Sequence, residues 1–226
     1  MVTTLYLVRH AQAQGNVEGT FQGSTDTPIS ENGRLQLERL AQRFLQFPIQ
    51  KVYSSPLRRA RQTALALNRY WQAPLRLRRG LLEIQCGDWE GRPWEELKRL
   101  EAEEYSVWQT SPHEFCARGG ERMAHVYARI CGAMQAIARE NPGGSVAVVS
   151  HGCALRNYLC WVHGFPFEQL RRVPWMEHTG ITRVDIREDG VPRLIFENDT
   201  RHLDAAMATL SKQNVIYGGV EPSADR

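Results

Sequence analysis

Long hydrophobic runs and an excess of charge of one sign are both missing from this sequence. Its apolar segments fall far short of the ~20 residues that a membrane-spanning helix needs, so we expect no membrane partner. The 28 basic residues nearly balance the 25 acidic ones, which leaves a formal charge of +3. Such a balance does not favour nucleic acid as a partner. The sequence does not predict an oligomeric state.

Cysteine is scarce and is not spaced in pairs. The five cysteines form no C-x-x-C pair and their number is odd, which argues against a disulfide framework or a zinc site. The first residues, Met1–Val8, lack the charged and long apolar regions of a secretory signal. We therefore expect free thiols in a reducing cytoplasm, no metal site and no cofactor.

Lysine is almost absent, because Lys51, Lys98 and Lys212 are the only lysines among the basic residues. Compositional bias is the simplest explanation of the arginine excess. A guanidinium also binds phosphate through two parallel hydrogen bonds, which is the functional alternative. The arginines do not cluster in one run, so only their positions along the chain can distinguish the two explanations.

Short hydrophobic runs alternate with amphipathic segments along most of the chain. Strands are predicted at 4–8, 51–54, 75–77 and 145–149, with a further short apolar segment at 81–84. Helices are predicted at 30–47, 56–71, 94–108, 121–140 and 153–163. The segments 181–187 and 191–196 flank Asp189 and Gly190, a hairpin signal. This order predicts an α/β fold, a three-layer α/β/α sandwich whose mostly parallel sheet has an antiparallel edge.

The length suits one domain over residues 1–226. No strand is predicted within 89–120, so this segment is expected to form a small helical cap insertion. Residues 218–226 are predicted to form a polar tail.

Polar side chains of the kinds that catalyse reactions or bind ligands follow several of the predicted strands. Arg9 and His10 follow the first strand, Arg58 and Arg59 come soon after the second, Glu83 lies in the 81–84 segment, and His151 follows the most strongly predicted strand. Ligands of parallel α/β sheets bind at the carboxyl ends of the strands. Each residue alone is typical of an ordinary core histidine or a surface charge. Their shared position at strand ends is what indicates a site.

The motifs around these residues resemble those of the histidine phosphatase superfamily, which includes cofactor-dependent phosphoglycerate mutases. Leu7–Gln12 resembles the Arg-His-Gly loop of the family, with Ala11 where the family often has glycine. Asn16 matches the asparagine six residues past the nucleophile. Three more motifs are similar: 54–64, 82–91 and 150–152. The 54–64 match selects Arg59 rather than Arg58, because the family arginine precedes an alanine.

The resemblance implies a metal-independent phosphomonoesterase that acts on small phosphorylated metabolites through a phosphohistidine intermediate. It implies that His10 is the nucleophile and that Glu83, whose pKa must then be raised, protonates the leaving alcohol. It implies that phosphate is held by Arg9, Arg59, a protonated His151 and the amides after His10. The implied catalytic residues are His10, Glu83, Arg9, Arg59 and His151, and the implied substrate-binding residues are Asn16, Gln22 and Gly152.

Two alternatives share this constellation. A cofactor-dependent phosphoglycerate mutase uses the same chemistry, but mutases of the family resemble one another in a longer, basic and proline-rich insertion after the acid. Only 67 residues separate Glu83 from His151, and Trp89–Gly91 resembles the phosphatase branch. A non-catalytic phosphate-binding regulatory module is the further alternative, which the presence of both His10 and Glu83 disfavours.

The sequence leaves open what the cap recognises. Its aromatic residues could form an apolar wall for the alcohol part of the substrate, although each could equally pack the cap onto the body. Its arginines could instead bind a carboxylate or a second phosphate. The aromatic candidates are Trp89, Trp94, Tyr105, Trp108 and Phe115, and the arginine candidates are Arg92, Arg99, Arg118 and Arg122.

Overall fold

The computed structural model describes residues 1–210 of the chain. The predicted polar tail at 218–226 lies outside this range. Within it, no helix is long and apolar enough to cross a membrane.

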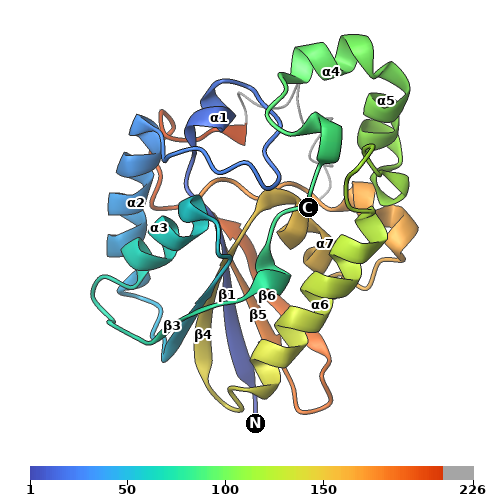
Figure 1. Ribbon diagram of the computed structural model, residues 1–226. Coiled ribbons are helices and arrows are strands. Elements are labelled where there is room, and N and C mark those ends of the chain that lie inside the picture. The colour runs from blue at the N-terminus through green and yellow to red at the C-terminus, as the bar shows by residue number, and fades with distance from the viewer. Residues whose placement is uncertain (211–226) are drawn as a thin grey trace.

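One six-stranded sheet forms the centre of the fold (Figure 1). Its strands lie in the order β3-β2-β4-β1-β5-β6. The first four of these pair in parallel, and β5 and β6 are antiparallel. This arrangement confirms the predicted α/β class with its antiparallel edge. The strands are β1 (Thr3–Arg9), β2 (Lys51–Ser54), β3 (Leu75–Leu77), β4 (Ser145–Ser150), β5 (Ile181–Ile186) and β6 (Pro192–Asp199).

Both faces of the sheet are covered, because alternate residues of the inner strands are apolar on each side. Leu5 and Leu7 of β1 pack into a core with α6 (Met123–Arg139) and α7 (Gly152–Val162). Tyr6 and Val8 point to the other face and pack with α2 (Glu31–Phe44) and α3 (Arg58–Leu67). Figure 1 shows α2 and α3 on one side of the sheet and α6 on the other. The predicted three layers are therefore present.

The start of α2 follows from its capping residue Ser30, where the predicted helix begins, but the helix ends at Phe44 rather than at 47. Ser30 has extended backbone and its hydroxyl accepts a hydrogen bond from the amide of Gly33 at 3.0 Å. That bond satisfies an amide that has no partner within the helix. The helix after β2 is shorter than predicted at both ends, since α3 begins at Arg58 and ends at Leu67.

The prediction of one helix over 94–108 was wrong. The chain forms α4 (Trp94–Leu100) and α5 (Ala102–Thr110), and Glu101 between them has φ −121° and ψ 44°, which is outside the helical region. The Glu101 carboxylate accepts a hydrogen bond from Arg92 at 2.9 Å. Figure 1 shows α4 and α5 at the end of the molecule opposite the N-terminus. We keep the proposal that 89–120 is a cap within a single domain.

The segment 81–84 forms no strand, because side chains rather than a neighbouring strand bind its carbonyl groups. The guanidinium of Arg129 donates to the carbonyls of Leu82 and Glu83, and the Ser150 hydroxyl donates to that of Leu81. Glu83 thus follows a 3-10 turn, not a strand end. The remaining short helices are α1 (Gln14–Val17), η1 (Arg79–Leu81), η2 (Gly87–Trp89), η3 (Pro112–Glu114) and η4 (Phe167–Arg172).

Candidate active site

His10 follows directly after β1, at the carboxyl end of a central strand. Its ring is buried, with 4% of the residue exposed. The Nδ1 atom lies 2.8 Å from the carbonyl oxygen of Ala11, and Nε2 lies 3.3 Å from Nε of Arg59. A guanidinium can only donate, so Nε2 accepts and Nδ1 carries the hydrogen. The ring is held in the tautomer that leaves a lone pair on Nε2.

Burial and neighbouring cations keep His10 neutral. Burial lowers its pKa well below 6.5, and the charge of Arg59 lowers it further. Two other imidazoles are close, because the ring centroids of His151 and His178 lie 5.1 and 5.4 Å from that of His10. A neutral imidazole with a lone pair on Nε2 has the form that a nucleophile requires.

Arg59 lies on the first turn of α3 and is buried, whereas Arg58 is exposed. Its two terminal nitrogens donate to the carbonyls of Thr25 at 2.6 Å and Gly23 at 2.8 Å. These bonds fix the plane of the guanidinium and direct Nε toward His10. The structure therefore places Arg59, and not Arg58, beside the histidine.

His151 follows β4 and is fully buried at the N-cap of α7. Its Nε2 lies 2.7 Å from the hydroxyl of Ser55, which comes directly after β2. Burial, then Arg59, lowers its pKa well below 6.5, so the ligand-free protein holds His151 neutral. The sequence prediction of a charged His151 concerned the phosphate complex, where a dianion would raise this pKa.

The Glu83 carboxyl group lies against the N-terminus of α7. One oxygen accepts from the amide of Cys153 and the other from that of Ala154, both at 2.9 Å. These bonds and Arg59 favour the carboxylate, but burial opposes it more strongly and raises the pKa of Glu83 above its ordinary 4.5. The direction of this shift agrees with the sequence prediction and suits a proton donor.

Arg9 and Gly152 are in close contact. Arg9 is 2% exposed, and its Nη1 donates to the carbonyl of Met176 at 2.6 Å. A Cβ atom on Gly152 would lie 3.3 Å from Nε of Arg9 and 3.2 Å from the ring of Trp175. A larger residue would push against both side chains, so Gly152 supports the site by leaving room.

Asn16 and Gln22 both line the cavity next to His10. Asn16 uses its carbonyl oxygen to accept from the amide of Ala13 at 2.9 Å. Gln22 accepts from the Thr27 hydroxyl at 2.6 Å, which leaves its amide nitrogen buried with no hydrogen-bond partner within residues 1–210. A buried donor without a partner is costly, so this atom is a strong candidate for a contact with substrate.

The cavity at His10 has a volume of about 40 Å³. Arg59 and His151 do not line it but are both next to His10, which does. The lining residues are Arg9, His10, Asn16, Thr20, Phe21, Gln22, Glu83, Ile84, Trp94, Trp108, Gly152, Cys153 and Trp175.

The expected role of the amides after His10 was wrong. The amide of Ala11 donates to the Thr63 hydroxyl at 3.0 Å, and the amide of Gln12 donates to the side-chain carbonyl of Gln36 at 2.9 Å. Both donors are therefore engaged within the protein. Ala11 is not among the residues with positive φ, which explains why alanine is accepted there.

Sequence reasoning missed a buried pair next to His10. His178 is fully buried, and burial, followed by the charge of Arg9, lowers its pKa to about 4. Its neighbour Glu177 accepts hydrogen bonds from the amides of Thr209 and Leu210, at 2.8 and 2.9 Å. Both residues precede β5 in a loop, and no strand end or motif marks them in the sequence.

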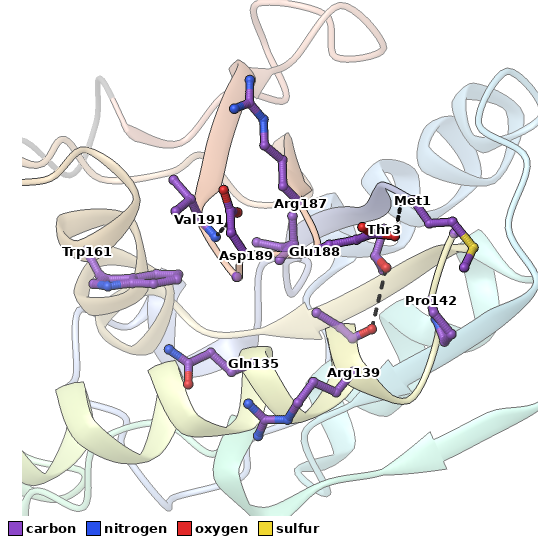
Figure 2. Close-up of a pocket in the computed structure, with 14 residues that line it drawn as sticks. Met1, Thr3, Gln135, Arg139, Pro142, Trp161, Arg187, Glu188, Asp189 and Val191 are labelled. Atoms are coloured by element: carbon purple, nitrogen blue, oxygen red, sulfur yellow. Dashed lines mark hydrogen bonds and ion pairs between the residues drawn. The ribbon is translucent and has the colours of Figure 1, made fainter.

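A second hollow, of about 700 Å³, lies at the opposite end of the strands from His10. Figure 2 shows this groove between α6 and the β5–β6 turn, with Trp161, Gln135 and Arg139 on one side and Arg187–Val191 on the other. None of the motif residues lines it. Within residues 1–210, no group of three or more His, Cys, Asp or Glu is placed to hold a metal ion. All five cysteines are free, and only Cys116 is exposed.

Comparisons with known proteins agree with this fold and site. The model of the histidine phosphatase superfamily (branch 1) matches residues 5–200. Phosphoserine phosphatase 1 of Hydrogenobacter thermophilus is 34% identical over 160 residues, which cover 71% of this chain and 76% of the relative. The probable phosphoglycerate mutase GpmB of Cronobacter sakazakii is 32% identical over 211 residues, 89% of this chain and 95% of the relative.

A solved structure is equally similar. Bacillus stearothermophilus YhfR has a TM-score of 0.85 to this chain at 31% identity, covering 89% of this chain and 100% of the other. The chain belongs to the histidine phosphatase superfamily. It is a phosphoric monoester hydrolase of the histidine phosphatase type, as the motifs predicted.

Proposed function

We propose that the protein hydrolyses small phosphorylated metabolites through a phosphohistidine formed on Nε2 of His10, without a metal ion. The observation that carries this proposal is the tautomer of His10: Nδ1 is held by the carbonyl of Ala11, while Nε2 accepts from Arg59. Substrate phosphate takes over the Arg59 donor, which frees the Nε2 lone pair. The nucleophile is then uncharged and lies beside fixed positive charge.

In the first half of the reaction, Nε2 attacks phosphorus and the bond from phosphorus to the ester oxygen breaks. The electron pair of that bond stays on the oxygen, which takes the proton of the Glu83 carboxyl group and leaves as the alcohol. Arg9 and Arg59 stabilise the charge on the phosphoryl oxygens, and the free amide nitrogen of Gln22 adds a neutral donor. His151 gains a proton when the dianion binds and becomes a further donor.

In the second half, water attacks the phosphohistidine on the same face from which the alcohol left. The Glu83 carboxylate takes a proton from this water as the nitrogen–phosphorus bond breaks. Inorganic phosphate forms, and neutral His10 and protonated Glu83 are restored. Positive charge in this cycle comes from arginine and histidine, so no step needs a metal ion.

The mutase alternative is less favoured, although one relative carries that name. A mutase must hold a phosphorylated carboxylic acid, and Arg9 is the one arginine among the residues that line the cavity within 1–210. A regulatory module without activity is also disfavoured, because His10, Glu83 and Arg9, which we propose as nucleophile, acid and phosphate-binding group, line one cavity. We propose a cytoplasmic location on the basis of the free cysteines.

The test is release of inorganic phosphate from a panel of phosphorylated metabolites, with and without excess EDTA. We expect turnover that EDTA does not reduce, and no turnover in His10→Ala. Loss of activity in EDTA that Mg²⁺ or Zn²⁺ restores would contradict the metal-free mechanism. Isomerisation of 3-phosphoglycerate faster than its hydrolysis would favour the mutase.

A further inference from the structure

Part of the wall of the cavity at His10 is aromatic. Phe21, Trp94, Trp108 and Trp175 line it together with Ile84. They come from separate parts of the chain: the loop before α2, the helices α4 and α5, and the loop before β5. These residues, which are distant in sequence, line the same cavity as His10 and Glu83.

These rings touch one another in a continuous series. The ring centroid of Phe21 lies 4.5 Å from that of Trp94 and 5.0 Å from that of Trp108. The Trp108 centroid lies 6.0 Å from that of Trp175. Spacings of this size are typical of packed aromatic pairs. Phe21, Trp94 and Trp108 are almost fully buried in this packing, and Trp175 is the partly exposed ring of the four.

The arginines that could bind an anionic substrate are turned elsewhere. Arg92 pairs with Glu96 at 2.8 Å and with Glu101 at 2.9 Å. Arg118 has 92% of its side chain exposed and pairs with Asp88. Arg99 and Arg122 are exposed, and none of the four lines the cavity.

Arg156 is near the wall but its donors are also committed. Its guanidinium carbon lies 4.7 Å from the ring centroid of Trp175. Its nitrogens donate to the carbonyls of Val173 and Arg171, at 2.8 and 2.9 Å. This residue fixes the tryptophan and its loop, and its charge is satisfied without substrate.

We propose that this cavity selects phosphate esters whose alcohol carries an aromatic or other apolar group and no negative charge. The proposal rests on the phosphatase function proposed above and specifies its substrate class. A carboxylate on the alcohol would lose its hydration next to the tryptophans without forming an ion pair in return, because Arg9 binds the phosphoryl group. An aromatic group would gain contact area with the same rings.

The test compares kcat/KM for 2-phenylethyl phosphate, O-phosphoserine and 3-phosphoglycerate. All three have alkyl leaving groups, so they differ mainly in what the alcohol carries. We expect 2-phenylethyl phosphate to be preferred by about tenfold or more, the scale of discrimination that an apolar pocket supplies. If neither these three esters nor any other monoester released phosphate, the proposed function itself would be contradicted. Faster hydrolysis of either carboxylate substrate would overturn the substrate class alone.

A matched pair of tryptophan variants separates recognition from folding. Trp175 and Trp161 are both partly exposed, but Trp161 lies on α7 and lines the groove at the opposite end of the strands from His10. Trp175→Ala should lower the ratio of kcat/KM for 2-phenylethyl phosphate to kcat/KM for O-phosphoserine by about tenfold. Trp161→Ala should leave this ratio unchanged. An equal loss on both substrates in a folded Trp175→Ala protein, judged by its thermal unfolding, would contradict the proposal.

Discussion

The Nε atom of Arg59 lies 3.3 Å from Nε2 of His10, and this contact determines the chemical state of the histidine. It makes the arginine a donor to the attacking nitrogen in the absence of substrate. It also places a buried positive charge beside the nitrogen that we propose attacks phosphorus. Arg59 therefore selects the tautomer of His10 and, after burial, is the next largest cause of its lowered pKa.

The two adjacent arginines of α3 are expected to differ sharply in importance. Arg59→Ala should reduce kcat/KM by about 10²–10³, the effect of removing one preorganised donor to a transition-state oxyanion. Arg58→Ala is the matched control and should stay within about twofold, because Arg58 is exposed and a helical step of ~100° turns it away. Equal losses in the two variants would show that the phosphate contact is assigned to the wrong arginine.

Glu83→Gln should affect substrates according to their leaving groups. An alkyl alcohol needs a proton as it leaves, whereas nitrophenolate leaves with little help. We expect the variant to lose most of its activity on an alkyl phosphate but to form the phosphoenzyme slowly from p-nitrophenyl phosphate. Rapid-quench measurements on both substrates check this. The same fractional loss on both would remove Glu83 from the role of leaving-group acid.

The pH dependence of turnover should reflect His10 and Glu83 together. His10 must be neutral, and its lowered pKa places that limit well below 6.5. Glu83 must be protonated, and its raised pKa moves the upper limit above 4.5. The kcat/KM for an alkyl phosphate should therefore depend on pH as a bell-shaped curve, with a maximum on the acidic side of neutral. A rate that keeps rising above pH ~9 would indicate hydroxide as the nucleophile instead.

Stability should fall as the medium becomes acidic, partly because of His178. Its pKa is about 4 in the folded protein, whereas the unfolded chain has the ordinary value of 6.5. Between pH ~4 and pH 6.5 the unfolded chain therefore binds more protons than the folded protein. Its contribution is complete above pH ~6.5 and is lost as pH falls toward about 4. Urea unfolding at pH 7 and pH 5 should show a smaller pH effect in His178→Asn than in the wild type. An identical pH effect in both proteins would mean that His178 is not held neutral.

Much of the site could be predicted from sequence because its histidines follow strongly hydrophobic strands. His10 and His151 occupy the ends of β1 and β4, where the run of buried residues stops. The 54–64 motif likewise distinguished Arg59 from Arg58. These features are local, so a pattern of adjacent residues reveals them.

Other features depend on contacts between distant segments. The 81–84 segment accepts hydrogen bonds from Arg129, 46 residues after Glu83, and from Ser150, 69 residues after Leu81. No local sequence pattern indicates these contacts. The His178 loop is likewise held by Thr209. The orientation of the cap arginines depends on their partners in the folded chain. Sequence therefore left the choice between aromatic and charged recognition open.

The most direct measurement is to trap and locate the phosphoryl group on the enzyme. The protein is mixed briefly with p-nitrophenyl phosphate, quenched under alkaline conditions that preserve phosphohistidine, digested and examined by mass spectrometry. Our account predicts phosphorylation of His10 alone, no label in His10→Ala, and label that decays at the rate of turnover. Label on Ser55 or another residue, or full turnover with no covalent intermediate in a rapid quench, would contradict it.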